Sequence, residues 1–131
     1  AFLYPQIKWR IIAHSGHGLC APGNITFHGW LPRDHVLDIL NHSTALVRLV
    51  DHDGLSYNVL EALALGRYVI WTYNFPFCIY CHKKISNLQC AINELLERFI
   101  PNLDGRSFVY EVFDSKRVTL QLLLTLKELQ K

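Results

Sequence analysis

The chain has 131 residues, of which half are hydrophobic and 18% are charged, a composition typical of a globular domain and not of a disordered chain. Its formal net charge of +2 is too small to indicate a nucleic-acid-binding surface, and no apolar run approaches the roughly 20 residues that span a bilayer. The length predicts one domain over residues 1–131.

Hydrophobic patterning predicts strands that alternate with helices through the first half of the chain. Pro32 suits the start of a helix, because its fixed φ is helical and its missing N–H would have no partner there. The elements are, in order, a strand at 7–13, a glycine-bearing loop at 15–23, a strand at 25–28, a helix with Val36, Leu37, Ile39 and Leu40 on its buried face, and an apolar strand at 44–50 that we expect to be covered on both faces.

The second half begins with an apolar helix at 55–65, which Gly66 is expected to end in a left-handed conformation. A buried strand at 68–72 follows, and residues 108–113 fit either a short helix or a strand. The remaining elements are a loop at 73–77, a short strand at 79–82, a helix capped by Ser86 or Asn87 that reaches Phe99 and is ended by Pro101, a turn at 102–106, and a closing helix at 115–130 with Val118, Leu122, Leu123 and Leu126 on its buried side.

This alternation predicts an α/β fold in which a parallel sheet has right-handed crossovers and helices on both faces. Ligands of such sheets bind beyond the carboxyl ends of the strands. The candidate site therefore consists of the four loops at 15–18, 29–32, 51–56 and 72–74.

The most informative segment is the start of the apolar helix, where Asp53 and Gly54 come first and Glu61 is the only charge inside the helix. A helix start offers unpaired N–H groups and the positive end of its dipole to an anion. Gly54 would let a phosphate approach the backbone closely, and the N–H groups of Leu55 and Ser56 would bind it. The alternative is that Asp53 or Ser56 only caps the helix.

Glu61 is the second candidate, because a carboxylate in an apolar helix is costly unless a hydroxyl or a cation meets it. It shares a helix face with Tyr57 and Asn58, and Asn58 is a further candidate contact. A salt bridge to Arg67 or to a nearby histidine is the alternative. A phosphate site followed by a hydroxyl-binding acid suits a sugar nucleotide.

These segments together resemble the donor-binding domain of retaining GT-B glycosyltransferases of the glycosyltransferase family 4 type. The resemblance covers roughly residues 6–72 and rests on an acid-x7-acid pattern followed by EAxAxG at 53–66, a strand and loop at 24–32, and a strand that ends in G-x-G at 9–18. It implies a Rossmann-like three-layer αβα domain, the C-terminal half of a GT-B fold. Beyond residue 72 the likeness is only architectural.

The resemblance also implies roles for single residues. Glu61 would bind the ribose hydroxyls, and Asp53 would contact hydroxyls of the donor sugar. Many members of the family have glutamate at the first acid position, so the shorter Asp53 leaves the accepted sugar open. The backbone of Gly29, Trp30 and Leu31 would contact the base, and Gly16 would leave room for the diphosphate, although both glycines could equally be turn residues.

The family neutralises the diphosphate with an arginine and a lysine placed one strand earlier. No such pair precedes Trp9, so we expect it upstream of Ala1 or absent. Arg48 ends a predicted strand and either approaches the phosphates or pairs with Asp51. No metal ion is expected, since GT-B sites of this kind are metal-independent.

The implied function is the donor-binding half of a retaining, hexosyltransferase-like enzyme. It would take a UDP-, GDP- or other nucleoside-diphosphate sugar and transfer the sugar to an acceptor hydroxyl on a glycan, a lipid or a small molecule. The chain has no Met, so we expect a fragment, inactive alone, that lacks the N-terminal acceptor domain and the first strand. The full protein would be cytoplasmic, could associate peripherally with a membrane, and would need no cofactor and no nucleic acid. The alternative is a noncatalytic nucleotide-binding or interaction module of the same fold.

The four cysteines form no regular framework, so a disulfide-stapled fold is not expected. Cys78, Cys81 and His82 have the C-x-x-C-H spacing of haem attachment, and Cys90 with a histidine could add zinc ligands. Plain thiols are the simplest interpretation. His14, His17 and His52 fall at predicted strand ends, but their spacing makes no metal cage.

Overall fold

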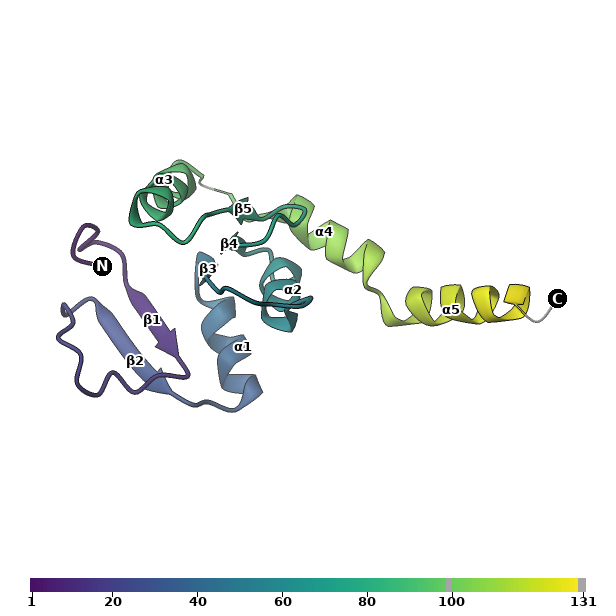
Figure 1. Cartoon of the computed structure of the whole chain (residues 1–131), viewed down its shortest axis with the longest axis horizontal. Helices are drawn as coiled ribbons and strands as arrows, with labels where there is room; N and C mark the ends of the chain where they lie inside the picture. Colours follow the sequence, from purple (N-terminus) through teal and green to yellow (C-terminus); the bar gives the residue numbers. More distant parts are fainter. Residues whose placement is uncertain (99, 130–131) are drawn as a thin grey trace. The chain divides into compact units, whose positions relative to one another are not determined.

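The structure is a computed structural model that describes residues 1–98 and 100–129, without the side chains of residues 124, 126, 127 and 129. It is a mixed α/β structure with small parallel sheets (Figure 1). The chain divides into two compact units, Ala1–His42 and Ser43–Lys131, and each is described by itself. Among the described residues, no helix combines the length and the apolar character that a membrane span requires.

The first unit contains a two-stranded parallel sheet and one helix. β1 (Trp9–Ile12) pairs with β2 (Ile25–Gly29), and the register shifts between Ile11 and Ile12. α1 (Arg33–Asn41) begins directly after Pro32, as predicted. Its expected inner face is confirmed, because Leu40 is buried and Val36, Leu37 and Ile39 are half-buried.

The second unit contains a three-stranded sheet in the order β3-β4-β5, with every pair parallel. Its strands are β3 (Ala45–Arg48), β4 (Tyr68–Trp71) and β5 (Ile79–Tyr80). All four residues of the central strand β4 are buried. β3 is only half-buried throughout, not covered as expected, because it lies at the edge of this sheet. Arg48 is opposite Trp71, so β3 and β4 end at the same edge of the sheet.

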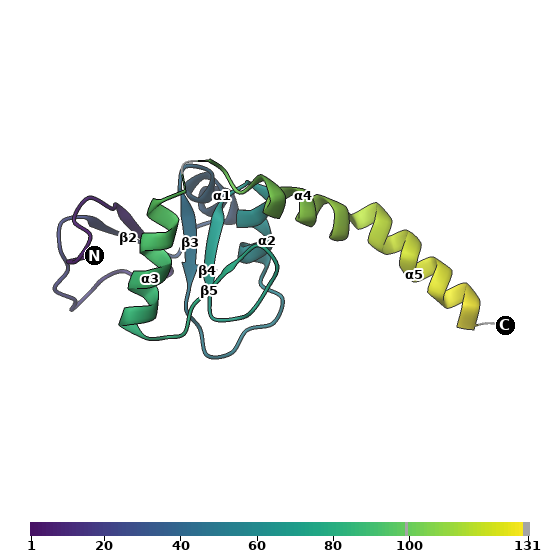
Figure 2. The same ribbon diagram turned by 90° about the horizontal axis from the view of Figure 1, so that it is seen from above.

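Helices cover this sheet and complete its core. α2 (Tyr57–Ala64) packs on β3 and β4 and against α4 (Leu103–Val112), and α3 (Ile85–Leu96) lies across the sheet from α2 (Figures 1 and 2). Gly66 ends α2 as predicted: its φ is +70°, its N–H donates to the Leu63 carbonyl, and the Arg67 N–H donates to the Ala62 carbonyl. The most deeply buried side chains are Val59, Leu63, Val69, Ile70, Trp71 and Cys81.

Two predicted elements beyond β5 differ from the structure. α3 begins at Ile85 with Lys84 at the N-cap, so the expected cap at Ser86 or Asn87 is wrong. The helix ends at Leu96, and the predicted end at Phe99 lies outside the described residues. The predicted turn at 102–106 is instead the start of α4, where Asn102 Oδ1 accepts a hydrogen bond from the Gly105 N–H at 3.1 Å. The ambiguous segment at 108–113 is helical as far as Val112.

The closing helix α5 (Ser115–Leu129) is present, but its predicted buried side is wrong. Val118, Leu122 and Leu123 are 48%, 59% and 51% exposed. The side chain of Leu126 and the predicted end at Gln130 lie outside the described residues. The apolar spacing thus indicated a helix correctly, whereas burial also requires a neighbouring surface, and the described side chains of α5 are all exposed.

Candidate functional site

The loops that follow β3 and β4 are joined by hydrogen bonds at the carboxyl edge of the sheet. Thr72 Oγ1 donates to the Val50 carbonyl at 2.7 Å and accepts from the Val50 N–H at 3.3 Å. The Tyr73 hydroxyl accepts from the Asp53 N–H at 2.9 Å and donates to the Asp51 carbonyl at 3.2 Å. The predicted meeting of the loops at 51–56 and 72–74 is therefore confirmed. Hydrogen bonds from Thr72 and Tyr73 hold residues 51–56, the acidic loop, in place.

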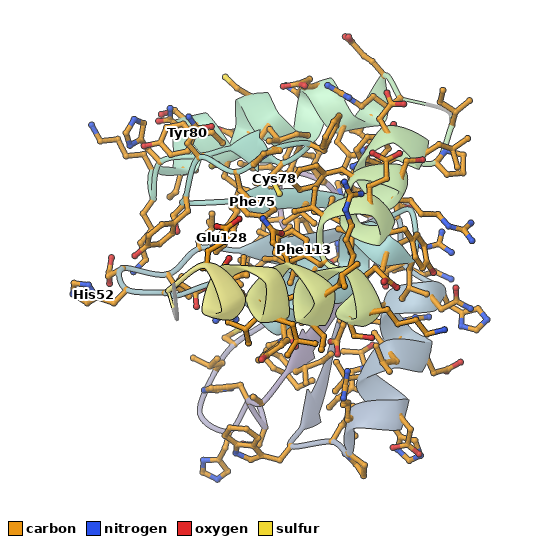
Figure 3. The ribbon with its side chains drawn as sticks, turned by 90° about the vertical axis from the view of Figure 1, so that its right-hand side faces the viewer. His52, Phe75, Cys78, Tyr80, Phe113 and Glu128 are labelled. Atoms are coloured by element: carbon orange, nitrogen blue, oxygen red, sulfur yellow. The ribbon has the colours of Figure 1, made fainter. Side chains whose placement is uncertain are left out.

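Aromatic rings anchor the loop after β4 to α4. The Phe75 ring lies 5.7 Å from the Trp71 ring, 5.9 Å from Phe108 and 6.4 Å from Phe113, centroid to centroid (Figure 3). Such edge-on and tilted contacts add to the burial of apolar surface. Tyr73 belongs to this anchored loop, so its hydroxyl is held within hydrogen-bonding distance of the Asp53 N–H and the Asp51 carbonyl.

Arg48 and Asp53 form the most buried ion pair of the site. Arg48 Nε lies 2.5 Å from Asp53 Oδ2, and the two side chains are only 30% and 11% exposed. The hydrogen bond from Arg48 lowers the pKa of Asp53 below its ordinary value, against the opposing effect of burial. The expected pairing of Arg48 with Asp51 is therefore wrong, and the sequence did not predict Asp53 as its partner.

Trp71 borders the same carboxylate from the end of β4. Its indole N–H and the Gly54 N–H lower the pKa of Asp53 further. The indole geometry nevertheless falls short of a hydrogen bond, so Trp71 Nε1 is buried without a full partner in the described part of the chain. The indole therefore acts as a nearby dipole that favours the ionised carboxylate.

A second ion pair joins the acidic loop to the residues after β5. Lys83 Nζ lies 2.7 Å from Asp51 Oδ2, and the side chains are 49% and 73% exposed. Sequence patterns did not point to Lys83, although the rule that ligands bind beyond the carboxyl ends of parallel strands covers the residues after β5 as well. His52, between the two acids, is exposed and points outward (Figure 3).

Asp51 and Asp53 have the Asp-x-Asp spacing of metal-binding aspartates. In the structure Asp51 and Asp53 bind different cations, Lys83 and Arg48. No group of three or more His, Cys, Asp or Glu side chains that could hold a metal ion occurs among the described residues.

The start of α2 differs in detail from the prediction. The helix begins at Tyr57, and Ser56 is its N-cap, so the first helical N–H groups are those of Tyr57 and Asn58, not those of Leu55 and Ser56. Neither N–H has an acceptor within residues 1–98 and 100–129. Ser56 occupies the N-cap position without a side-chain capping bond, and Asp53 is paired with Arg48, so neither side chain caps the helix.

Gly54 lies just before α2 and Glu61 lies within it, as the predicted phosphate and hydroxyl contacts require. A Cβ atom at Gly54 would meet no atom within 4 Å, so the backbone there is open on that side. Glu61 is half-buried in α2, one turn after the exposed side chains of Tyr57 and Asn58. Glu61 already has an interaction partner within the protein, which a ligand hydroxyl would join or replace.

The other predicted contacts, Gly16, Gly29, Trp30 and Leu31, belong to the first unit. Gly16 has φ +76°, and a Cβ there would lie 2.6 Å from two ring atoms of Phe27. Gly29 has φ +64° and open space around it. Trp30 is 87% exposed and Leu31 is half-buried. Gly16 is therefore required by its own turn and by Phe27, whatever else it does.

We expect Gly16→Ala to lower the free energy of unfolding by about 2 kcal/mol more than Gly18→Ala. Both glycines have a left-handed φ, but Gly18 has no atom within 4 Å of its added Cβ, so the control isolates the clash with Phe27. Denaturant titrations of the two variants measure the difference. Equal losses would show that the Phe27 ring moves aside without cost.

The cysteines are all free. Burial raises the pKa of the half-buried Cys78 thiol to about 12 and raises that of the buried Cys81 thiol. Thiols with such pKa values stay protonated near neutral pH, and a metal ligand must be deprotonated. The plain-thiol interpretation of the C-x-x-C-H segment is therefore the one the environment favours.

At the carboxyl edge of this sheet, Arg48, Lys83, Asp51, Asp53 and the Tyr73 hydroxyl form one bonded cluster. The two carboxylates belong to the loop that leads into the start of α2. Guanidinium and ammonium groups bind anions by charge-assisted hydrogen bonds, so the arrangement can bind and orient a phosphate group. Comparison of the chain with protein-family models, with curated proteins and with solved structures found no match.

Proposed function

We propose that this chain is the nucleotide-sugar-binding half of a retaining glycosyltransferase, a Rossmann-like αβα domain of the GT-B type. The support is the resemblance of residues 6–72 together with a parallel sheet whose β3-α2-β4 segment carries the acid-x7-acid motif. The helices α2 and α3 on opposite sides of the sheet agree with such a domain (Figure 2).

The observation that carries the proposal is the open start of α2. The N–H groups of Tyr57 and Asn58 have no acceptor in the described part of the chain, Ser56 does not cap them, and Gly54 adds no side chain. A helix start in this state attracts a phosphate through its N–H groups and its dipole. Here the diphosphate of the donor binds.

Glu61 then receives the ribose. It follows Tyr57 by one helical turn, so its carboxylate lies on the face of α2 that leads away from the phosphate site. A carboxylate accepts hydrogen bonds from two vicinal hydroxyls, and these bonds are strong because the acceptor is charged. This order of groups, phosphate first and hydroxyls next, matches a nucleoside diphosphate.

Asp53 has a different part in this proposal from the one that the resemblance implies. Its carboxylate is 11% exposed and bound to Arg48, so it orients Arg48 toward the phosphates and offers little surface to a sugar. Transfer would then depend on positioning and charge stabilisation. The same observation favours the second candidate, a noncatalytic nucleotide-binding module, because the acid assigned to the donor sugar is already engaged.

Titration calorimetry of the 131-residue chain with UDP and GDP tests the proposal. We expect one of these diphosphates to bind, and Glu61→Gln to weaken its binding about tenfold or more, as for loss of a hydrogen bond to a charged group. Glu97→Gln is the matched control, since Glu97 is exposed at the end of α3 and should leave the affinity unchanged.

Failure of both diphosphates to bind, or equal affinity in the Glu61 and Glu97 variants, would count against the donor site. A sugar-transfer assay of the chain combined with an N-terminal acceptor domain of the GT-B type separates the two candidates. Transfer with retained anomeric configuration supports the enzyme, whereas nucleotide binding without transfer supports the noncatalytic module.

A further inference from the structure

Lys83 is a cation at the carboxyl edge of the sheet to which neither the motif nor the family resemblance assigns a role. It follows β5, yet its ammonium group reaches Asp51 in the loop after β3, 32 residues away in sequence. Arg48 ends β3 and is bound to Asp53, two residues further along the same loop. The Tyr73 hydroxyl contacts the backbone of both acids, so the two ion pairs belong to one cluster.

The two pairs differ in how firmly they hold their cations. The Arg48–Asp53 pair is mostly buried, with a lowered pKa for the acid. The Lys83–Asp51 pair is exposed on both sides, at 49% and 73%, and exposed pairs contribute little to stability because water and salt compete with them. Lys83 can therefore leave Asp51 for a stronger anion at small cost, while Arg48 stays in place.

Arg48 is bound only through Nε. Its two Nη groups have no acceptor among the described residues, although the side chain is 70% covered by the protein, as its 30% exposure implies. A guanidinium that is fixed through one edge and has no protein acceptor on the other can bind an oxyanion in the fork geometry that phosphate fits.

We propose that Arg48 and Lys83 together bind the pyrophosphate group of the ligand, with Asp51 as the internal partner that the phosphate replaces on Lys83. This inference rests on the proposed nucleotide function and names the phosphate-binding cations of its site. The expected upstream arginine and lysine are then not needed for phosphate binding by this chain. Arg48 ends β3 and Lys83 follows β5, the strands on either side of β4. A ligand with two linked anionic groups can meet both cations, and the Asp51 carboxylate that leaves Lys83 returns to water.

Binding of inorganic pyrophosphate to the 131-residue chain at low ionic strength is the test, measured by calorimetry. We expect Lys83→Gln to weaken binding about tenfold, in line with loss of a charged hydrogen bond, and Lys84→Gln to leave it unchanged. Lys84 is the adjacent, exposed lysine and so controls for net charge. Asp51→Asn should strengthen binding up to about threefold, because the competing carboxylate is gone.

Opposite effects of substituting the two partners of one ion pair are a signature that general destabilisation does not produce. Equal pyrophosphate affinities in the Lys83 and Lys84 variants, or weaker binding in Asp51→Asn, would overturn the inference. The same titrations with UDP and GDP separate it from the proposed function. Nucleotide binding that ignores Lys83 removes only this inference, whereas pyrophosphate binding that depends on Lys83, without any nucleotide binding, removes the nucleotide function.

Discussion

Replacing Asp53 by asparagine is expected to lower the free energy of unfolding by about 2 kcal/mol at neutral pH, the scale of a hydrogen bond to a charged group. The substitution keeps the size of the side chain and leaves the mostly covered Arg48 without its counter-ion, which is the costly way to break such a pair. Asp51→Asn in the exposed pair with Lys83 is the matched control and should cost less than about 1 kcal/mol.

The difference between wild type and Asp53→Asn should also depend on pH. The pKa of Asp53 is lower in the folded protein than its ordinary value of 3.8, so ionised Asp53 stabilises the fold above that value, and the stabilisation is lost as the pH falls through the folded-state pKa. Denaturant titrations of both proteins between pH 7 and pH 2 measure this. A constant difference over the whole range, or a cost equal to that of Asp51→Asn, would contradict the assigned role of the pair.

Local sequence signals predicted the elements whose determinants are local. Pro32 marks the start of α1, Gly66 ends α2, and the apolar run at Tyr68–Trp71 forms the buried central strand. Each of these outcomes depends on one residue's backbone preference or on continuous burial. The mixed α/β architecture with parallel strands follows from the same signals.

The errors arise where a side chain has a partner that local patterns do not contain. Asn102, Asp104 and Gly105 read as a turn, but Asn102 caps α4, and its side chain lies 2.7 Å from the position of a Cβ at Gly105. Gly105 is thus the residue that lets the cap form, and the same glycine made the helix look unlikely by composition. For α5 the helix was predicted correctly, but the predicted burial of its apolar side was wrong.

The sequence predicted which segments form the candidate site, but not which charged side chains pair there. The loops, Gly54 and the helix with Glu61 follow from the motif, whereas the actual partners of Arg48 and Lys83 depend on tertiary contacts between separate loops. Because Asp53 is bound to Arg48, it cannot cap α2, and the helix begins two residues later than expected.

Cys78 is expected to react with iodoacetamide at least about a hundredfold more slowly than Cys20 in the native protein at pH 8. Burial raises the pKa of Cys78 from 9.0 to about 12, which lowers its thiolate fraction at that pH about a thousandfold, partly offset by the greater nucleophilicity of a more basic thiolate. Cys20 is exposed and serves as the internal control.

Mass spectrometry of the alkylated peptides over time measures both rates in one sample, and in concentrated guanidinium the two cysteines should react alike. Cys90 is exposed and should follow Cys20, whereas the buried Cys81 should follow Cys78. If Cys78 and Cys81 react as fast as Cys20 without denaturant, their thiols are ionised and accessible, and the C-x-x-C-H segment becomes a candidate for metal or haem chemistry. Slow reaction of both agrees with two thiols that the protein covers and leaves ligand binding to the charged loops at the end of the sheet.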